Sequence, residues 1–348
     1  CLATSVAGAV AGAVLASACA ALVLLRERPA LQGALLVALQ WGALMRAHEP
    51  LYQLSPEELL TTPPVFVERI RALTAPGESV RVASSLRDLP PPPRLAGLRH
   101  NDALNLLQLY VLAPDMVALW GLESANEYLP GVSPRVRQLK ADRVHWFTRL
   151  APRLGTRFIA FATAEQRELG ARLSARSTFV DPLMGLTLVE YADAAPRIHL
   201  ARPECVQGRA EALRRMMSPQ LPPPDVAIVE CQAPLPPTPE GPLGSIHVAP
   251  GTPEHLTVEV ASLAPAVLVV NDAWQPGWRA TVDGQDVPIL PADVAVRAVV
   301  VPAGQHRVEL RYRTPGLTAG LLLGALSWLG LALACLGRRF VPRRRAAA

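Results

Sequence analysis

The last third of the chain shows the clearest hydrophobic pattern. Residues 255–261 and 306–312 alternate strictly between apolar and polar side chains, which indicates strands with one buried and one exposed face. Residues 266–271 and 296–301 are more continuously apolar, as expected for central strands that are covered on both faces. With a hairpin signal at Asp283-Gly284, about six strands predict a small external β-sandwich over residues 241–315.

The middle of the chain has mixed periodicity. The pattern predicts short strands and helices in alternation, which indicates a mixed α/β domain over residues 47–240. The predicted strands are 78–85, 156–163, 185–191, 197–201 and 226–230, and the predicted helices are 65–73, 103–119, 134–150 and 164–173. A proline-rich stretch at 231–244 predicts a domain boundary near residue 240.

The two ends of the chain are strongly apolar. Residues 1–25 and 316–337 carry no charge and reach the roughly 20 residues needed to cross a bilayer, and residues 30–45 form a shorter apolar run. Arginines follow the first and last runs, and the positive-inside rule places both groups in the cytoplasm only if the chain crosses three times.

The predicted fold class is therefore a membrane protein with about three transmembrane helices. Residues 1–46 hold two of them and residues 316–337 the third, followed by a cytoplasmic basic tail at 338–348. Residues 47–315, the mixed α/β domain and the β-sandwich, lie outside the cytoplasm. The predicted location is the cell membrane, with several crossings and large extracytoplasmic domains. Because the first residue is Cys1, we expect a fragment of a longer membrane protein.

Composition and charge agree with this interpretation. Half of the 348 residues are hydrophobic, and the net charge of +5 equals the five arginines of the C-terminal run, so the rest of the chain is neutral. The basic tail has no accompanying aromatic or zinc-binding motif, which argues against a nucleic-acid partner.

The sequence assigns no catalytic, cofactor-binding or metal-binding residue. The seven histidines have no metal-ligand spacing, and we expect no cofactor. Asp272, Glu123 and Glu127 are candidate external carboxylates, but their spacing predicts no pairing.

Two cysteines lie in the external part of the chain. Cys205 and Cys231 each follow a predicted strand in a space that favours oxidation. Spacing alone does not give the separation of their Cα atoms, so a candidate disulfide and two free buried thiols both remain open.

The stretch NDAWQPGWRATVDGQDVPI, residues 271–289, contains two tryptophans around a Gln-Pro-Gly turn. Trp278 shares a strand face with Ala280 and Val282, so we expect it in the core. Trp274 precedes the turn, and three roles remain open for it: it caps the sheet edge, contacts the upstream domain, or binds a glycan.

Residues 268–316 resemble the C-terminal external part of the YfhO-like family of bacterial membrane proteins. The shared features are a strand, the Pro-Gly-Trp corner, a Val-Asp-Gly hairpin and a Val-Pro-Ala-Gly-x-His turn before the last strand. Weaker similarity lies upstream, at residues 51–64, 120–135, 153–161 and 189–201.

The resemblance implies a glycosyltransferase-like membrane protein that moves sugar from a polyprenyl-phosphate carrier to a cell-surface glycan or polymer. The catalytic carboxylate of such enzymes usually lies in an early external loop, which this chain does not contain. The chain would then support the transfer, with membrane lipid, the carrier-linked sugar and the surface glycan as partners. The alternative is a membrane-anchored interaction or glycan-binding module without catalysis, and the sequence leaves open whether the chain is part of an enzyme.

Overall fold

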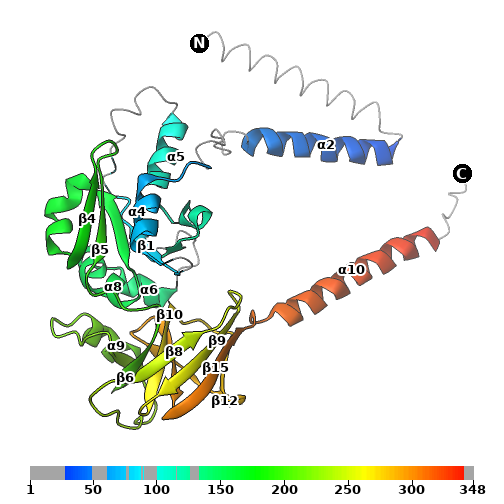
Figure 1. The fold of residues 1–348 in the computed structure, drawn as a ribbon. Coiled ribbons are helices and arrows are strands. Elements are labelled where there is room, and N and C mark those ends of the chain that lie inside the picture. The colour runs from blue at the N-terminus through cyan, green and yellow to red at the C-terminus, as the bar shows by residue number, and fades with distance from the viewer. Residues whose placement is uncertain are drawn as a thin grey trace, which may run out of the picture. The chain divides into compact units, whose positions relative to one another are not determined.

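The computed structural model describes residues 28–48, 61–75, 78–87, 89, 100–114, 116–125 and 133–340 (Figure 1). The chain divides into two compact units, residues 1–62 with 95–106, and residues 63–94 with 107–348. The first unit contains helix α2 (Pro29–His48) and most of α5 (His100–Tyr110). The features below belong to the second unit, which contains two five-stranded sheets and a closed five-stranded barrel.

The prediction of a membrane protein with about three transmembrane helices is wrong. Among the described residues, no helix combines the length and the apolar character that a bilayer crossing requires. The apolar runs at 30–45 and 316–337 do form helices, α2 and α10 (Leu317–Phe340), while the run at 1–25 lies outside the described residues. Gln32, Gln40 and Arg46 interrupt the apolar character of α2. The apolar composition of these two runs therefore predicted helices correctly, but the prediction that the helices cross a membrane was wrong.

The first sheet has the strand order β2-β1-β3-β5-β4. β1 pairs in parallel with β2 and β3, and β5 continues the sheet antiparallel to β3 and β4. The strands are β1 (Arg81–Ser84), β2 (Glu123–Ser124), β3 (Phe158–Ala162), β4 (Ala175–Asp181) and β5 (Leu186–Tyr191). The surrounding helical segments are α4 (Val65–Leu73), η3 (Met116–Trp120), α6 (Pro134–Leu139), α7 (Arg143–His145), η4 (Trp146–Leu150), α8 (Ala151–Arg153), η5 (Thr163–Arg167) and η6 (Gly170–Arg172).

The strands after residue 240 do not form the predicted β-sandwich. Instead, β10, β13 and β14 join two upstream strands, β6 and β7, in the closed barrel β10-β14-β13-β7-β6. The barrel strands are β6 (Ile198–Val206), β7 (Val226–Glu230), β10 (Ala266–Ala273), β13 (Ile289–Ala292) and β14 (Val296–Val301), with α9 (Gly208–Met216) between β6 and β7. The reason is the pairing of β10 with β6, which runs from Val267↔Ala201 to Val270↔Ile198. These pairings join strands on either side of residue 240. The boundary near residue 240 is not tested by them and stays a prediction.

The third sheet is open and has the order β12-β11-β15-β9-β8. Its strands are β8 (Gly244–Val248), β9 (His255–Ser262), β11 (Trp278–Val282), β12 (Gln285–Val287) and β15 (Gly304–Tyr312). The expected hairpin at Asp283-Gly284 joins β11 to β12, and both turn residues have positive φ, as this type of turn requires.

Burial on both faces explains the apolar run of residues 266–270 in strand β10. Val267 and Val269 pack into the core cluster that the barrel shares with the first sheet, whereas Leu268 and Val270 pack into the cluster that it shares with the third sheet. Alternate side chains of a strand point to opposite faces, and here both faces are covered. The prediction of a central strand buried on both sides is confirmed.

The Gln-Pro-Gly turn after Trp274 depends on its glycine. Gly277 has a φ of 105°, a conformation that side-chain-bearing residues rarely adopt. A Cβ atom at this position would also lie 2.5 Å from the carbonyl oxygen of Arg313. The backbone can therefore pass close to the end of β15 and place Trp278 at the start of β11.

Candidate functional site

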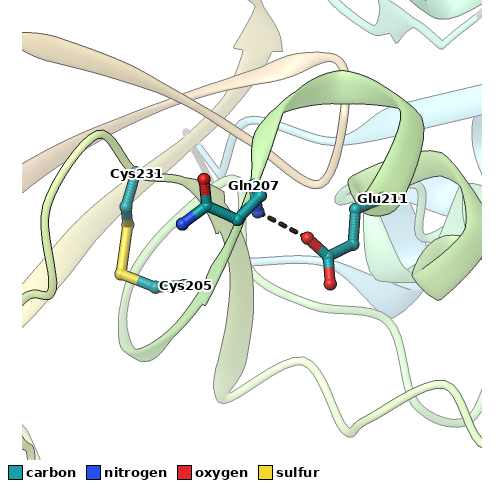
Figure 2. Close-up of a disulfide and its surroundings, with 4 residues drawn as sticks. All are labelled: Cys205, Gln207, Glu211 and Cys231. Carbon is teal, nitrogen blue, oxygen red and sulfur yellow. Dashed lines mark hydrogen bonds between the residues drawn. A yellow bond between two sulfur atoms is a disulfide. The ribbon is translucent and has the colours of Figure 1, made fainter.

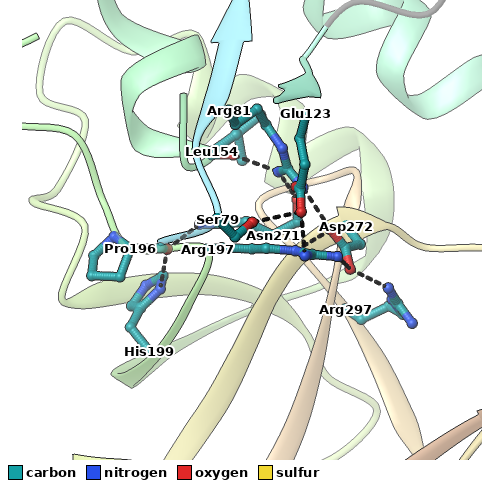
Figure 3. A network of polar contacts seen from close by, with 10 residues as sticks. All are labelled: Ser79, Arg81, Glu123, Leu154, Pro196, Arg197, His199, Asn271, Asp272 and Arg297. Carbon is teal, nitrogen blue, oxygen red and sulfur yellow. Dashed lines mark hydrogen bonds and ion pairs between the residues drawn. The ribbon is translucent and has the colours of Figure 1, made fainter. Parts of the chain in front are cut away.

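Asp272, near the end of β10, lies at the centre of a network of arginines (Figure 3). Its Oδ1 atom lies 2.7 Å from Nη2 of Arg81, and its Oδ2 atom lies 3.1 Å from Nη2 of Arg197 and 2.9 Å from Nη2 of Arg297. Glu123 provides a second carboxylate, 2.6 Å from Arg197 and 3.3 Å from Arg81. The network joins the first sheet, through β1 and β2, to the barrel.

The arginines fix the protonation state of Asp272. Burial alone would raise the pKa of this carboxyl group, but the attraction of Arg81, Arg197 and Arg297 outweighs burial and lowers the pKa from 3.8 to about 2. Asp272 therefore stays ionised at neutral pH. A carboxylate held in this way is suited to positioning its neighbours and not to general acid or base catalysis, which works best with a pKa near the working pH.

Arg297 is the most deeply buried member of the network. Its side chain is 3% exposed, and burial lowers its pKa from 12.5 to about 10 despite the attraction of Asp272. The guanidinium Cζ atom lies 3.8 Å from the ring centroid of Trp278, so the cation stacks on the aromatic face. Trp278 also contacts Tyr312, with a centroid separation of 5.4 Å, and packs against the core of the third sheet.

The network positions the segment that carries Trp274. Arg81 donates to the backbone oxygen of Asn271 at 2.5 Å, and the backbone N–H of Trp274 donates to Ala295 O at 2.7 Å. The register of β10 against β14 shifts between Val270 and Ala273, as in a β-bulge. Bulges redirect side chains, and here the bulge comes directly before Trp274.

Arg135, from α6, covers one side of the Trp274 ring. Its Cζ atom lies 4.9 Å from the ring centroid, within the range of a cation–π contact. Two further contacts hold the guanidinium in place: Glu230 binds it with oxygens at 2.5 and 3.2 Å, and the backbone oxygen of Val294 accepts a hydrogen bond of 2.8 Å. Of the three roles that the sequence leaves open for Trp274, this contact corresponds to the one with the upstream region.

Trp274 also lines a groove of about 450 Å³, which we call the Trp274 groove. Two aromatic rings, two arginines and several polar or proline side chains line it. They are Ser133, Pro134, Arg135, Arg209, Trp274, Gln275, Pro276, Tyr312 and Pro315. Aromatic rings that present a flat surface beside hydrogen-bonding groups are suited to a ligand with both apolar faces and polar edges, such as a sugar.

Two acidic residues of this region could be predicted from the sequence, but their arrangement could not. The sequence indicated Asp272 and Glu123 without pairing them, and the structure brings both onto Arg81 and Arg197. Glu127 lies outside the described residues. The arginines had no recognisable signal, because Arg81 and Arg197 are far from Asp272 in the sequence and only the strand pairings bring them together.

Cys205 and Cys231 lie at neighbouring ends of β6 and β7 (Figure 2). Their sulfur atoms are joined in the structure, with the Cα atoms 5.4 Å apart, a separation that suits a disulfide. Beside them, the N–H of Gln207, just before α9, donates to Glu211 Oε2 at 2.6 Å. That the bond forms in the protein stays a prediction, which is tested below.

Metal chemistry has no visible site in the part of the chain that the structure describes. No three His, Cys, Asp or Glu side chains in this part come together in an arrangement that could hold a metal ion.

The sequence comparisons connect the C-terminal sheets to a class of bacterial membrane proteins. Residues 246–324 match the family model described as "Bacterial membrane protein YfhO". The resemblance predicted from residues 268–316 is therefore confirmed for this segment, which contains Trp274, the Gly277 corner and the third sheet. No curated protein and no solved structure matches the chain significantly.

Proposed function

We propose that this chain supports the transfer of sugar from a polyprenyl-phosphate carrier to a cell-surface glycan, and that its own contribution is to bind the glycan in the Trp274 groove. The observation that carries the proposal is the match of residues 246–324 to a bacterial membrane protein family together with the position of Trp274 inside the matched segment. The aromatic and polar lining of the groove suits a carbohydrate.

The proposal assigns binding, and not catalysis, to the described residues. Asp272 and Glu123, which had been candidate carboxylates, are held by ion pairs with arginines, and the low pKa of Asp272 makes it a poor proton donor. We further propose that the sheets lie outside the cytoplasm, where the surface glycan is found. The adjacent Cys205 and Cys231 support this location, because disulfides persist mainly in oxidising compartments.

The first test measures glycan binding by the full chain. Isothermal titration with oligomers of glucose and of N-acetylglucosamine, and with their uronic-acid counterparts, should show binding to at least one oligomer. Trp274→Ala should abolish most of that binding, whereas Leu263→Ala, a change at an exposed side chain outside the groove, should leave it intact. Loss of an aromatic stacking partner typically costs about tenfold or more in affinity. Unchanged binding by Trp274→Ala would contradict the proposal.

The second test is made in cells of the producing bacterium. Disruption of the gene should cause carrier-linked sugar to accumulate and should change the surface glycans, and replacement by the Trp274→Ala variant should reproduce both effects in part. If disruption changes neither the carrier-linked sugars nor the surface glycans, the role in sugar transfer is wrong. If binding in vitro depends on Trp274 while the carrier-linked sugars stay constant, the alternative of a glycan-binding module without a role in transfer is favoured.

A further inference from the structure

Among the described residues, no carboxylate pairs with one of the two arginines of the Trp274 groove. Arg209 lies on α9, and its Nε and Nη2 atoms both donate to Oε1 of Gln138, at 2.9 and 2.6 Å. This partner is a neutral amide. Within the described part of the chain, no aspartate or glutamate forms an ion pair with Arg209, and no acidic residue lines the groove.

The second arginine of the groove differs in this respect. Arg135 forms a two-pronged ion pair with Glu230, and its guanidinium also lies on the ring of Trp274. Its charge is therefore locally balanced and its position fixed by the protein. Arg209, which is partly exposed, is the cation of the groove that a ligand can approach with its charge unmatched.

The bond from Gln138 orients the Arg209 side chain without neutralising it. A guanidinium presents five N–H donors in a planar fork, and a single amide oxygen engages only part of that fork. Such a group favours a carboxylate or a phosphate over a hydroxyl group, because the anion carries the opposite charge and its two oxygens match the planar fork of N–H donors.

We propose that Arg209 determines the specificity of the Trp274 groove for an acidic sugar, one that carries a carboxylate or a phosphate ester. This inference rests on the proposed function, since it names the class of glycan that the same groove takes. Trp274 and Tyr312 provide the aromatic surface for the sugar ring, and Arg209 binds the anionic group at its edge.

The test compares matched ligands on matched variants of the full chain. The ligands are a neutral oligomer of glucose, the corresponding oligomer of glucuronic acid, and a glucose 6-phosphate-terminated oligomer. The variants are Arg209→Gln, Arg209→Lys and the control Arg214→Gln, which removes an exposed arginine of the same helix that does not line the groove. Circular dichroism confirms that each variant is folded.

The wild-type chain should bind at least one acidic oligomer about tenfold more tightly than the neutral one, a preference that weakens as salt is added. Arg209→Gln should weaken binding of the acidic oligomer more than binding of the neutral one and so remove this preference, Arg209→Lys should retain part of it, and Arg214→Gln should behave like the wild type. Which acidic oligomer binds more tightly identifies the anionic group.

Two outcomes would overturn the inference, and they are distinguishable. Equal affinity for neutral and acidic oligomers, in the wild type and in Arg209→Gln alike, would refute the role of Arg209 and leave glycan binding in place. Failure of the wild-type chain to bind any oligomer would refute the proposed function, and the inference with it.

Discussion

Arginines occur in two settings in this molecule, around Asp272 and beside Trp274. Around Asp272, three guanidinium groups converge on one carboxylate, and Arg81 also donates to the backbone oxygens of Asn271 and Leu154. Beside Trp274, one arginine lies on an aromatic ring and another binds a neutral amide. In the first setting the side chains of Arg297 and Arg81 are 3% and 13% exposed and that of Arg197 is 40% exposed, whereas the second setting lines a groove.

The difference distinguishes arginines that stabilise the fold from an arginine that can bind a ligand. The ion pairs around Asp272 hold the first sheet against the barrel. Because these charges are already paired within the protein, they provide little attraction for a charged ligand. A charge that the protein leaves unmatched next to aromatic rings favours a ligand that supplies the missing partner. Substitution of Asp272 disturbs the first setting and substitution of Trp274 the second, and each should leave the other setting unchanged.

The largest effect is expected from the centre of the buried network. Asp272→Ala leaves Arg297, which is 3% exposed, without its only ion-pair partner among the described residues. Removing one partner of a buried ion pair costs about 3 to 5 kcal/mol. Chemical denaturation of the full chain measures this loss, with Asp286→Ala, an exposed aspartate on β12, as the control that should change stability by less than about 0.5 kcal/mol. A loss below about 1 kcal/mol for Asp272→Ala would show that the network does not hold the sheets.

The second-largest effect on stability is expected from the disulfide between Cys205 and Cys231, which would join β6 to the end of β7. If Cys205 and Cys231 are bonded, the closed loop spans 26 residues, and reduction should lower stability by about 3 kcal/mol in the chain-entropy model. Mass spectrometry of non-reduced peptides, prepared with alkylation of free thiols, decides whether the bond forms. Recovery of both cysteine peptides in alkylated form would show that the disulfide does not form. Glycan binding should survive reduction, because neither cysteine lines the groove.

Acid should weaken the network through Asp272. Its pKa falls from 3.8 to about 2 on folding, so the unfolded chain takes up a proton before the folded chain does. The stabilisation is fully present above pH 3.8 and is lost as the pH falls through the window down to about 2. This contribution is roughly 2 kcal/mol, and the Asp272→Asn variant should lack it. A pH series of denaturation curves tests this, and equal slopes for wild type and variant in that window would contradict it.

The smallest effect on stability is expected at the groove. Trp274→Ala removes the half-buried indole ring together with its cation–π contact with Arg135, a contact worth about 1 kcal/mol. Thermal unfolding measures this cost, and the titrations described above measure the accompanying loss of binding. If Trp274→Ala were as destabilising as Asp272→Ala, Trp274 would be a structural residue and the contrast between the two settings would fail.

The elements that the sequence predicted well are those in which one local pattern determines the outcome. Helix α4 occupies residues 65–73 as predicted, and the apolar residues that dominate β10 and β14 are buried on both faces. The missed strands have weak local signals. β13 contains Pro291, which sequence patterns disfavour inside a sheet, and β8 follows directly on a proline-rich stretch.

The closed barrel and the buried network were beyond prediction for a different reason. Both depend on pairings between residues far apart in the chain, such as Val267 with Ala201 and Asp272 with Arg81. Spacing and periodicity describe neighbours within one element, and they do not show which strands become partners. Trp274 was identified because it stands beside a turn, whereas Arg209 lies on a helix that the sequence pattern did not predict.

The most direct test of the account asks which tryptophan a glycan touches. The full chain is labelled with 5-fluorotryptophan, and the fluorine resonances of Trp274 and Trp278 are assigned with the Trp274→Phe and Trp278→Phe variants. Addition of the tightest-binding oligosaccharide should shift the resonance of Trp274, which lines the groove, and leave that of Trp278, which packs against Arg297, nearly unchanged. A shift at Trp278 with none at Trp274 would contradict the account.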